Sequence, residues 1–492
     1  MRNIPAAIRK PVPTATDSTA RGFVVVFIGL QVGMMISGID GTIVATALPS
    51  ITRDLGGVSG IAWVVSAYLL FQVATMPLYG KLGDLHGRKR VLLFAIGLFV
   101  LGSVACGLAQ SMPQLLVARA VQGMGGGGLP VLGMAILGDL VPPRQLGRWL
   151  GYQGMLFAVA VVIGPLVGGL FVDHLSWRWA FFINVPFAIL AVAILVPRLH
   201  LPFRRVEHAI DYLGSALLTI GLAALVVLAT AGGKDVEWIS PESGVLLVVL
   251  VLASVAFVWR ERHAAEPFVP LRLFQNEVLR IAAPVNFTSG LLFYLGVFFL
   301  PVFFQEVAGV DATASGLLLI PFMIGTAAST TFAGHRVERT GRYRAWPILG
   351  GVAMTVGALA LTTIGLDTSV AVVAGLGTII GIGIGFAMQT SILAVQNAVD
   401  VTDLGMATST ALLARTLGGT IGTPLFGAVL AAGVPAHHAT AADFAGALPW
   451  VFAGAVPVGL LAVLFGWLLP QRPLRGVGDG TEVTIDTVIA PH

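Results

Sequence analysis

The chain has 492 residues, of which 56% are hydrophobic and only 11% are charged. A soluble protein of this length carries about twice that charged fraction. Apolar runs of about 20 residues, long enough to cross a bilayer core as helix, recur along the chain. The composition therefore excludes an ordinary soluble protein and predicts a polytopic, all-α membrane protein in contact with the lipid bilayer.

The charge balance and the cysteine count exclude further classes. The net charge is +4, but the basic residues sit in the connections between apolar runs, so no nucleic-acid partner is expected. The single cysteine, Cys106, rules out an intrachain disulfide and argues against a metal cluster. No metal site is expected.

The predicted membrane spans follow a polar start. Residues 1–21 are polar and basic, and the apolar run after them is too long for a signal-peptide core. We expect them to form a retained tail before the first helix. Fourteen spans are predicted, at 22–49, 60–79, 91–110, 113–137, 147–171, 178–197, 212–231, 243–259, 279–305, 313–334, 345–365, 370–396, 405–431 and 448–469.

Basic residues set the orientation. With both termini in the cytoplasm, inside segments hold 23 of the 28 Lys and Arg, and the outside loops hold Arg53, Arg178 and Lys234. The positive-inside rule favours this orientation over its reverse. The two remaining arginines, Arg119 and Arg415, lie within spans. We expect a multi-pass protein of a bacterial cytoplasmic membrane.

One charged loop occurs twice. Gly80-x-x-x-Asp84-x-x-Gly87-Arg88 returns 254 residues later as Gly334-x-x-x-Glu338-x-x-Gly341-Arg342. The first copy joins predicted spans 2 and 3, and the second joins spans 10 and 11, which indicates parallel six-helix repeats with spans 7 and 8 inserted. Chance similarity between two basic loops is the alternative. The predicted parts are a tail (1–21), a first bundle (22–197), a linker with two inserted helices (198–277), a second bundle (278–469) and a cytoplasmic tail (470–492).

Several motifs resemble one transporter family. The Gly80–Lys89 loop resembles the loop 2–3 signature of the major facilitator superfamily. Other segments resemble its fourteen-helix drug:proton antiporter branch, of the EmrB/QacA type. These segments are Ile39–Pro49, Arg119–Gly123, Gly154 with Gly164–Gly169, Trp177–Pro186, Asp211–Gly214, Glu266–Phe274 and Arg415–Gly419. The resemblance covers nearly the whole chain and implies the major facilitator fold with two inserted helices.

The repeated loops are candidates for a cytoplasmic gate. Their glycines permit tight turns, and Arg88 can pair with an acid at the inner end of span 4, where Asp139 is the candidate. Such contacts would latch the two halves on the inside. A plain turn with topogenic charges is the alternative. The gate prediction comprises Gly80, Asp84, Gly87, Arg88, Asp139, Glu338 and Arg342.

Two residues are candidates for proton coupling. Asp40 is the acid that lies well inside a span, where a carboxylate must face a cavity, pair with a cation or be protonated. Arg119 needs an anionic or carbonyl partner for the same reason. By the 254-residue offset between the repeats, Val373 is the residue of the second half that corresponds to Arg119. The resemblance implicates both positions in proton transfer, and structural hydrogen bonding or a structural ion pair is the alternative. Arg415 is interpreted as structural or as part of the substrate path.

Glycines in span 5 are interpreted as an antiporter motif. Gly164 and Gly168 share a helix face and permit close helix contact, while Pro165 removes a backbone hydrogen bond. The resemblance links this motif to antiport, with helix packing as the alternative. The motif comprises Gly154, Gly164, Pro165, Gly168 and Gly169. Polar and aromatic residues within spans could line the substrate cavity or only pack: Gln31, Tyr68, Gln72, Gln122, Gln153, Phe157, Asn286, Tyr294, Phe298, Gln389 and Arg415.

Cofactor chemistry finds little support. Gly123–Gly128 fits G-x-G-x-x-G but lies within a span with no strand before it, and no phosphate-binding P-loop occurs. We expect no enzyme and no cofactor, with the proton as coupling ion. The predicted function is proton-coupled export of small amphiphilic compounds, as in multidrug efflux. A dedicated exporter of one metabolite, antibiotic or siderophore, and a non-transporting sensor or lipid-handling scaffold, are the alternatives. A monomer is expected, and a periplasmic adaptor stays undecided.

Overall fold

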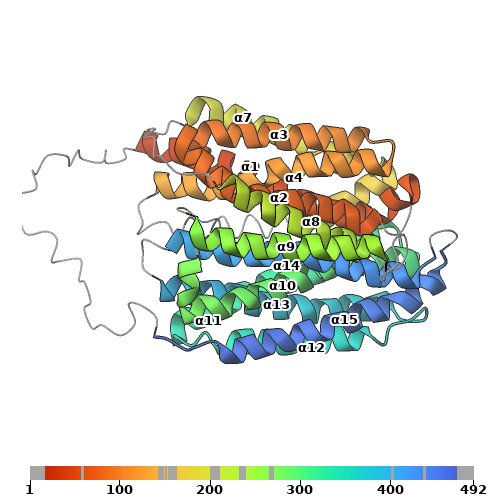
Figure 1. The fold of residues 1–492 in the computed structure, drawn as a ribbon. Coiled ribbons are helices and arrows are strands. Elements are labelled where there is room, and N and C mark those ends of the chain that lie inside the picture. Colours follow the sequence, from red (N-terminus) through yellow and green to blue (C-terminus); the bar gives the residue numbers. More distant parts are fainter. Residues whose placement is uncertain are drawn as a thin grey trace, which may run out of the picture.

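The computed structural model describes most of the chain as long helices that run side by side (Figure 1). The described residues are 17–56, 60–141, 149, 152, 163–199, 211–231, 240–264, 271–399, 404–435 and 439–473. We call one end of the bundle the Gly80 end, because the α2–α3 connection lies there, and the other the Asp54 end.

The first helices follow the predicted spans. Gly87, with φ of 92°, separates the second from the third, because L side chains rarely adopt this backbone conformation. Ser111, in extended conformation, precedes the fourth, which has proline in its first turn. The helices are α1 (Asp17–Leu55), α2 (Gly60–His86), α3 (Arg88–Leu108), α4 (Met112–Leu140), helical residues 163–174, α6 (Trp179–Phe182) and α7 (Asn184–Arg198).

The later helices differ from prediction mainly at their ends. The last one begins at Ala441 rather than at 448, because Thr440 and Asp443 form a capping box that starts the helix earlier. The elements are α8 (Tyr212–Ala231), α9 (Pro241–His263), η1 (Leu271–Gln275), α10 (Glu277–Val302), η2 (Phe303–Val307), α11 (Ala312–Thr340), α12 (Ala345–Leu361), α13 (Val370–Ala398), α14 (Leu404–Gly433) and α15 (Ala441–Leu468).

The helices suit a membrane. Within the described residues, 10 helices are long and apolar enough to cross a bilayer. Three shorter apolar stretches occur at Trp63–Met76, Leu213–Ala229 and Ala345–Leu361. Predicted span 147–171 falls largely outside the described residues, which include its helical part from residue 163. The chain is therefore an all-helical, multi-pass membrane protein.

Helix packing repeats between the halves. A Cβ at Gly127 of α4 would lie 2.6 Å from the Gln72 carbonyl oxygen of α2. In the second half, Gly385 of α13 meets the Thr326 carbonyl of α11 in the same way. Both glycines allow two backbones to touch where a side chain would separate them. The repeat seen in the loops therefore extends to the packing of the helices.

The repeated loop also repeats its backbone requirement. Gly87 and Gly341, which correspond in the repeat, both have positive φ, at 92° and 67°. Next to Gly341, the Tyr343 hydroxyl donates to the Pro470 carbonyl at 2.7 Å and fastens the segment after α15. Burial raises the pKa of the Tyr343 phenol, which keeps it a neutral donor.

The inserted helices pack unequally. α8 contacts both α2 and α14, and α9 packs chiefly against α8. Leu70 of α2, Leu222 of α8 and Leu413 of α14 belong to one buried cluster. The pair α8–α9 is joined by an ion pair of 2.9 Å between Arg260 and Asp211. α8 therefore lies against the seam between the two halves.

Candidate functional site

A buried ion pair lies inside the first bundle. Arg119 of α4 approaches Asp40 of α1, with Nη1 to Oδ2 at 2.6 Å. Asp40 is 0% and Arg119 1% exposed. The sequence predicts that each of these residues needs a partner within the membrane, and the structure shows that each is the partner of the other.

Amide and hydroxyl groups complete the Asp40 site. Gln122 Nε2 and Asn184 Nδ2 both donate to Asp40 Oδ1, at 2.7 and 2.9 Å. Ser103 Oγ accepts from Asn184 at 2.9 Å and donates to the Phe181 carbonyl at 2.8 Å. α4 and α7 thereby meet the Asp40 carboxylate of α1, and α3 is joined to the site through Ser103. Three donors, from Arg119, Gln122 and Asn184, therefore point at this carboxylate.

The Arg119 guanidinium is held on several sides. Its Nε donates to the Val64 carbonyl at 3.1 Å, and Nη1 also reaches Gln122 Oε1 at 2.7 Å. The guanidinium carbon lies 4.3 Å from the centre of the Tyr68 ring. A cation over a ring face in a desolvated place is attracted by about 2 kcal/mol. Arg119 is therefore fixed by a carboxylate, an amide, a carbonyl and a ring.

This buried pair is costly to break. Removing one partner of a buried ion pair leaves an uncompensated charge, which costs about 3–5 kcal/mol. Asp40 and Arg119 therefore stabilise the first bundle only when both are present.

Two predictions around Arg119 need correction. Gln122 was expected to line the substrate cavity. Its side chain is instead fully buried and hydrogen-bonds to Asp40, Arg119 and Ser103. Val373 was expected to correspond to Arg119 in the second half. The α4 and α13 glycine contacts set a register, shifted by one helical turn, in which Gly377 corresponds to Arg119. The second half lacks this arginine in either register.

The other cavity candidates separate into groups. On α2, Gln72 Nε2 lies 3.4 Å from the Tyr68 hydroxyl. Tyr294 and Phe298 stack with ring centres 5.7 Å apart.

The remaining candidates are buried, half-buried or not described. Asn286 is buried and donates to Ser391 of α13 at 2.9 Å, so it packs α10 on α13. Gln31 is buried with an unpartnered Nε2, whereas Gln389 and Arg415 are half-buried. Gln153, Phe157 and also Gly154 of the antiporter motif lie outside the described residues.

The predicted Arg88–Asp139 pair exists but does not join the halves. Arg88 Nη1 lies 2.7 Å from Asp139 Oδ1 and 2.8 Å from the Ala135 carbonyl. Both residues belong to the first bundle, so this pair fastens α3 to α4 and does not latch one half to the other. Arg342 is exposed.

The other predicted gate residues show no described contact between the halves. Gly80 lies near Val131, and the backbone of Gly87 turns the chain. The side chains of Asp84 and Glu338 are outside the described part of the structure.

Polar contacts between the halves occur at the Asp54 end. Asp173, in the last turn of the helical residues 163–174, accepts from the backbone N–H groups of Ala312 and Thr313, at 3.0 and 2.6 Å, and from the Thr313 hydroxyl. These N–H groups begin α11, where the helix dipole favours a negative charge. Gln305 donates to the Thr46 carbonyl at 3.0 Å.

An ion pair and a polar recess lie beside these bonds. Arg53 and Glu306 pair at 3.6 Å. The recess, of about 460 Å³, is lined by Ser50, Asp173 and Gln305 among others. The described residues thus hold the halves together at this end.

The antiporter glycines lie at the same junction. A Cβ at Gly168 would be 2.7 Å from the Ile43 carbonyl of α1. Gly169 faces Ala312 and Thr313 of α11, and Gly316 of α11 faces the Pro165 carbonyl. The motif therefore packs within the first half through one face and against the second half through the other.

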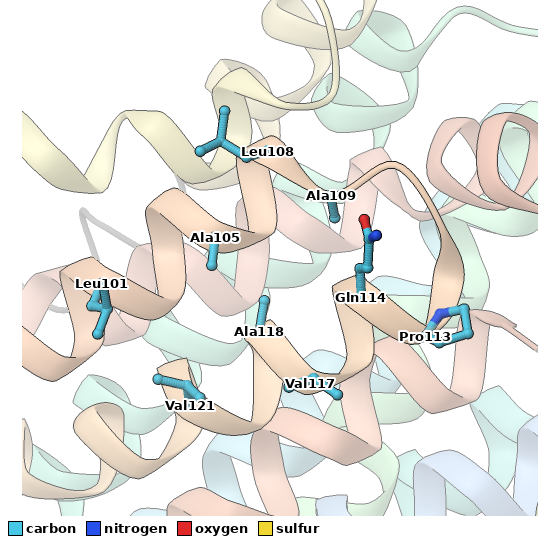
Figure 2. Close-up of a pocket in the computed structure, with 9 residues that line it drawn as sticks. All are labelled: Leu101, Ala105, Leu108, Ala109, Pro113, Gln114, Val117, Ala118 and Val121. Carbon is cyan, nitrogen blue, oxygen red and sulfur yellow. The ribbon is translucent and has the colours of Figure 1, made fainter.

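A separate apolar groove opens between α3 and α4. Figure 2 shows Leu101, Leu108, Val117 and Val121 among the residues around it, and its volume is about 670 Å³. Leu101 and Val117 are 63% and 67% exposed. Such exposed apolar side chains face lipid in a membrane protein, so we assign the groove to the lipid-facing surface.

Sequence reasoning missed several residues of these sites. Ser103 and Asn184 hold Asp40, and Asp173 and Gln305 join the halves. Asn184 was quoted within a motif without a role, and Ser103 is a single hydroxyl in an apolar span. Asp173 had a usable signal, because it is an acid one helical turn after Gly169, the last of the antiporter glycines.

Comparison with known proteins assigns the family. The family model described as Major Facilitator Superfamily matches residues 30–423. Multidrug transporter protein MdtP of Bacillus subtilis is 36% identical over 402 residues, covering 82% of this chain and 74% of the relative. Multidrug resistance protein 3 of Bacillus subtilis is 35% identical over 416 residues, covering 85% and 81%.

A solved structure has the same fold. A bacterial homolog of the human lysosomal transporter Spinster, in an inward-facing and unoccupied conformation, aligns with a TM-score of 0.68 at 16% identity, over 93% of this chain and 98% of that one. At this identity the likeness shows the fold alone. Taken with the family match over most of the chain, it leads to one conclusion: the chain belongs to the major facilitator superfamily of membrane transporters.

Proposed function

We propose that this transporter exports small amphiphilic compounds in exchange for protons, as a fourteen-span drug:proton antiporter. The relatives named for multidrug transport and multidrug resistance support export of such compounds. The observation that carries proton coupling is the buried Asp40–Arg119 pair at 2.6 Å. A titratable acid held by an arginine within a membrane is the arrangement that proton relays in transporters use.

The proposed coupling uses the competition between a proton and Arg119 for Asp40. A proton arriving from outside neutralises Asp40 and releases Arg119, which then needs a new acceptor. Release of the proton to the inside restores the ion pair at 2.6 Å. Substrate leaves in the outward-open state and binds in the inward-open state. The pair would therefore alternate between closed and open in each cycle.

The orientation is proposed from charge. The predicted inside segments carry 23 of the 28 Lys and Arg, and the α2–α3 connection with Arg88 and Arg90 is one of them, so the Gly80 end is assigned to the cytoplasm. The contacts of Asp173, Gln305 and Arg53 then close the outer side. The conformation described is accordingly interpreted as inward-facing, with both termini in the cytoplasm.

A dedicated exporter of one endogenous metabolite is the second candidate. The observation that favours it is the shortage of free carboxylates. Asp40 is the acid deep within the described spans, and three donors already occupy it. A pump for varied dicationic drugs would use additional acids within its spans.

Proton coupling is tested with purified protein in proteoliposomes under an imposed pH gradient. Asp40→Asn should abolish substrate-driven proton flux, because the amide cannot carry the proton. Asp367→Asn is the matched control, since Asp367 is an exposed acid in the α12–α13 connection. Undiminished proton flux in Asp40→Asn would remove Asp40 from the mechanism.

The choice between the two candidates needs a substrate panel. A multidrug exporter should drive proton flux with several chemically unrelated amphiphiles. A dedicated exporter should respond to a single compound class. Asp40→Asn in the same panel shows whether every response depends on the same acid.

A further inference from the structure

Arg415 is a membrane-embedded cation without a carboxylate partner. It lies on α14, within the candidate span Thr410–Gly433. Its Nη1 reaches Met388 Sδ at 3.3 Å, and no acid among the described residues forms an ion pair with it. A thioether is a weak acceptor. A cation at such a place requires a counter-charge or lines a substrate path.

The contrast with Arg119 makes Arg415 unusual. Arg119 is neutralised by Asp40 at 2.6 Å and is 1% exposed. Arg415 is half-buried, so part of its side chain is reachable. The deep part of the described spans therefore contains two arginines and one carboxylate. One positive charge is left over at Arg415.

The position of Arg415 is between the halves. It contacts Met388 of α13, and a Cβ at Gly290 of α10 would meet the Arg415 carbonyl. A Cβ at Gly419, one helical turn after Arg415, would meet the Tyr294 ring of α10. α14 also packs against α2 of the first half, so Arg415 lies on a helix of the interface. Substrate sites of such two-halved transporters lie at this interface near the midplane.

Tyr294, on the helix that packs against the Arg415 backbone, belongs to a group of aromatic rings. Tyr294 stacks on Phe298 with ring centres 5.7 Å apart and meets Phe293 edge-on at 5.5 Å. Rings beside a charged group suit a ligand that has an apolar body and one charged end. A planar guanidinium binds carboxylate or sulfonate oxygens through paired N–H donors.

We propose that Arg415 binds the charged end of the transported substrate, and that this substrate is an amphiphilic organic anion with a carboxylate or sulfonate group. The aromatic body of the substrate lies against Tyr294. This inference rests on the proposed antiport and names its substrate class. It excludes a cation as the preferred substrate, because Asp40, the acid that would attract one, is bound to Arg119.

The test uses probes that differ in one charged group. 1-Anilinonaphthalene-8-sulfonate is an anion, and N-phenyl-1-naphthylamine is the same ring system without the sulfonate. Tetraphenylphosphonium serves as the cation. Probe-driven proton flux is measured in vesicles of phosphatidylcholine, so that no anionic lipid headgroup supplies the counter-charge. Repeating the measurement with added phosphatidylglycerol shows whether a lipid competes.

In the wild type, the sulfonate should have the lowest KM of the three probes. Arg415→Gln should raise the KM for the sulfonate by about tenfold or more, the worth of a charged hydrogen bond. The KM for the neutral amine should stay within about twofold. The KM of Arg415→Lys for the sulfonate should lie between those of the wild type and Arg415→Gln, because lysine keeps the charge but lacks the planar guanidinium.

A matched variant guards against nonspecific loss of charge. Arg339→Gln removes an exposed arginine near the end of α11 and should leave all three KM values unchanged. Retained flux with the neutral amine shows that Arg415→Gln folds. Lowering of the sulfonate flux by phosphatidylglycerol in the wild type, absent in Arg415→Gln, would further support an anion site.

The outcomes separate this inference from the proposed function. If the sulfonate and the neutral amine behave alike in the wild type, or if Arg415→Gln leaves the sulfonate KM unchanged, the anion site is wrong while antiport stands. If phosphatidylglycerol alone responds to Arg415→Gln, Arg415 is a lipid site and the substrate assignment is wrong. A protein that couples none of the probes to protons contradicts both.

Discussion

Arg119 and Asp40, from α4 and α1, form an ion pair of 2.6 Å that is shielded from solvent on both sides. Gln122 and Asn184 occupy the other carboxylate oxygen. Three helices of one bundle, α1, α4 and α7, are therefore fastened at a single charged point. The pair serves folding and, by the proposed mechanism, transport.

The two charges should behave as a unit in stability measurements. Asp40→Ala should lower the free energy of unfolding by about 3–5 kcal/mol, because Arg119 stays buried without its counter-charge. The double variant Asp40→Ala, Arg119→Met should be less destabilised than the sum of the single variants. Denaturant unfolding in detergent measures the free energies of unfolding of the wild type, the two single variants and the double variant. Additive effects would show that the two side chains are energetically independent.

Asn184 should tune the pair without removing a charge. Its amide donates to Asp40 and Ser103, so Asn184→Ala leaves two hydrogen bonds unmade. The expected loss of stability is about 1–3 kcal/mol. Substrate-driven proton flux should persist, because both charges of the Asp40–Arg119 pair remain. Ser176→Ala, at a half-buried position near the Asp54 end, is the comparison. Stability equal to that of Ser176→Ala would show that the two Asn184 hydrogen bonds contribute nothing.

Asp173 should control how often the Asp54 end opens. Asp173→Asn removes the charge that holds the first turn of α11, an interaction of about 0.3–2 kcal/mol. A cysteine at Ser50, in a protein with Cys106→Ala, reports opening through reaction with a membrane-impermeant maleimide. Labelling should become about two- to thirtyfold faster, by conversion of that energy.

The control for this opening experiment is Asp54→Asn. Asp54 pairs with Arg178 at 3.1 Å and accepts from Trp177, within the first half only. Its variant should leave the labelling rate of Ser50→Cys near that of the parent. Equal rates for the two aspartate variants would assign the effect to surface charge and not to the contact with α11.

Glycine substitutions distinguish close packing from backbone conformation. Gly168→Ala should destabilise the protein by about 1–3 kcal/mol, because the added methyl meets the Ile43 carbonyl of α1. Gly97→Ala is the control, since nothing lies within 4 Å of its Cβ position. Thermal unfolding in detergent compares them. A Gly97→Ala variant as unstable as Gly168→Ala would rule out packing as the cause.

Much of the fold could be predicted from the sequence. Hydropathy located the helices because long apolar segments must satisfy their backbone internally in lipid. The loop repeat identified which helices correspond. The start of α15 was wrong, because Thr440 and Asp443 cap the helix by side-chain bonds that hydropathy does not register. The register between α4 and α13 also needed the glycine contacts.

The candidate site was less predictable. Asp40 and Arg119 stood out because charges inside a span demand partners. Gln122 was assigned to the cavity because an amide's partner cannot be read from its own helix. The Arg88–Asp139 pair was anticipated, but sequence does not tell whether a pair lies within a half or between halves. Asp173 and Gln305 depend on contacts between distant helices.

The placement of α8 makes the seam between the halves lopsided. On one side of the molecule α8 lies against both α2 and α14, and Leu70, Leu222 and Leu413 share one cluster there. Elsewhere in the seam, Gly169 and Gly316 bring the helical residues 163–174 directly against α11. The two halves are therefore joined in two ways, through the side chains of an intervening helix and through backbones that touch. By the proposed alternating access, relative movement of the halves has to rearrange side-chain packing at the first contact and backbone contacts at the second.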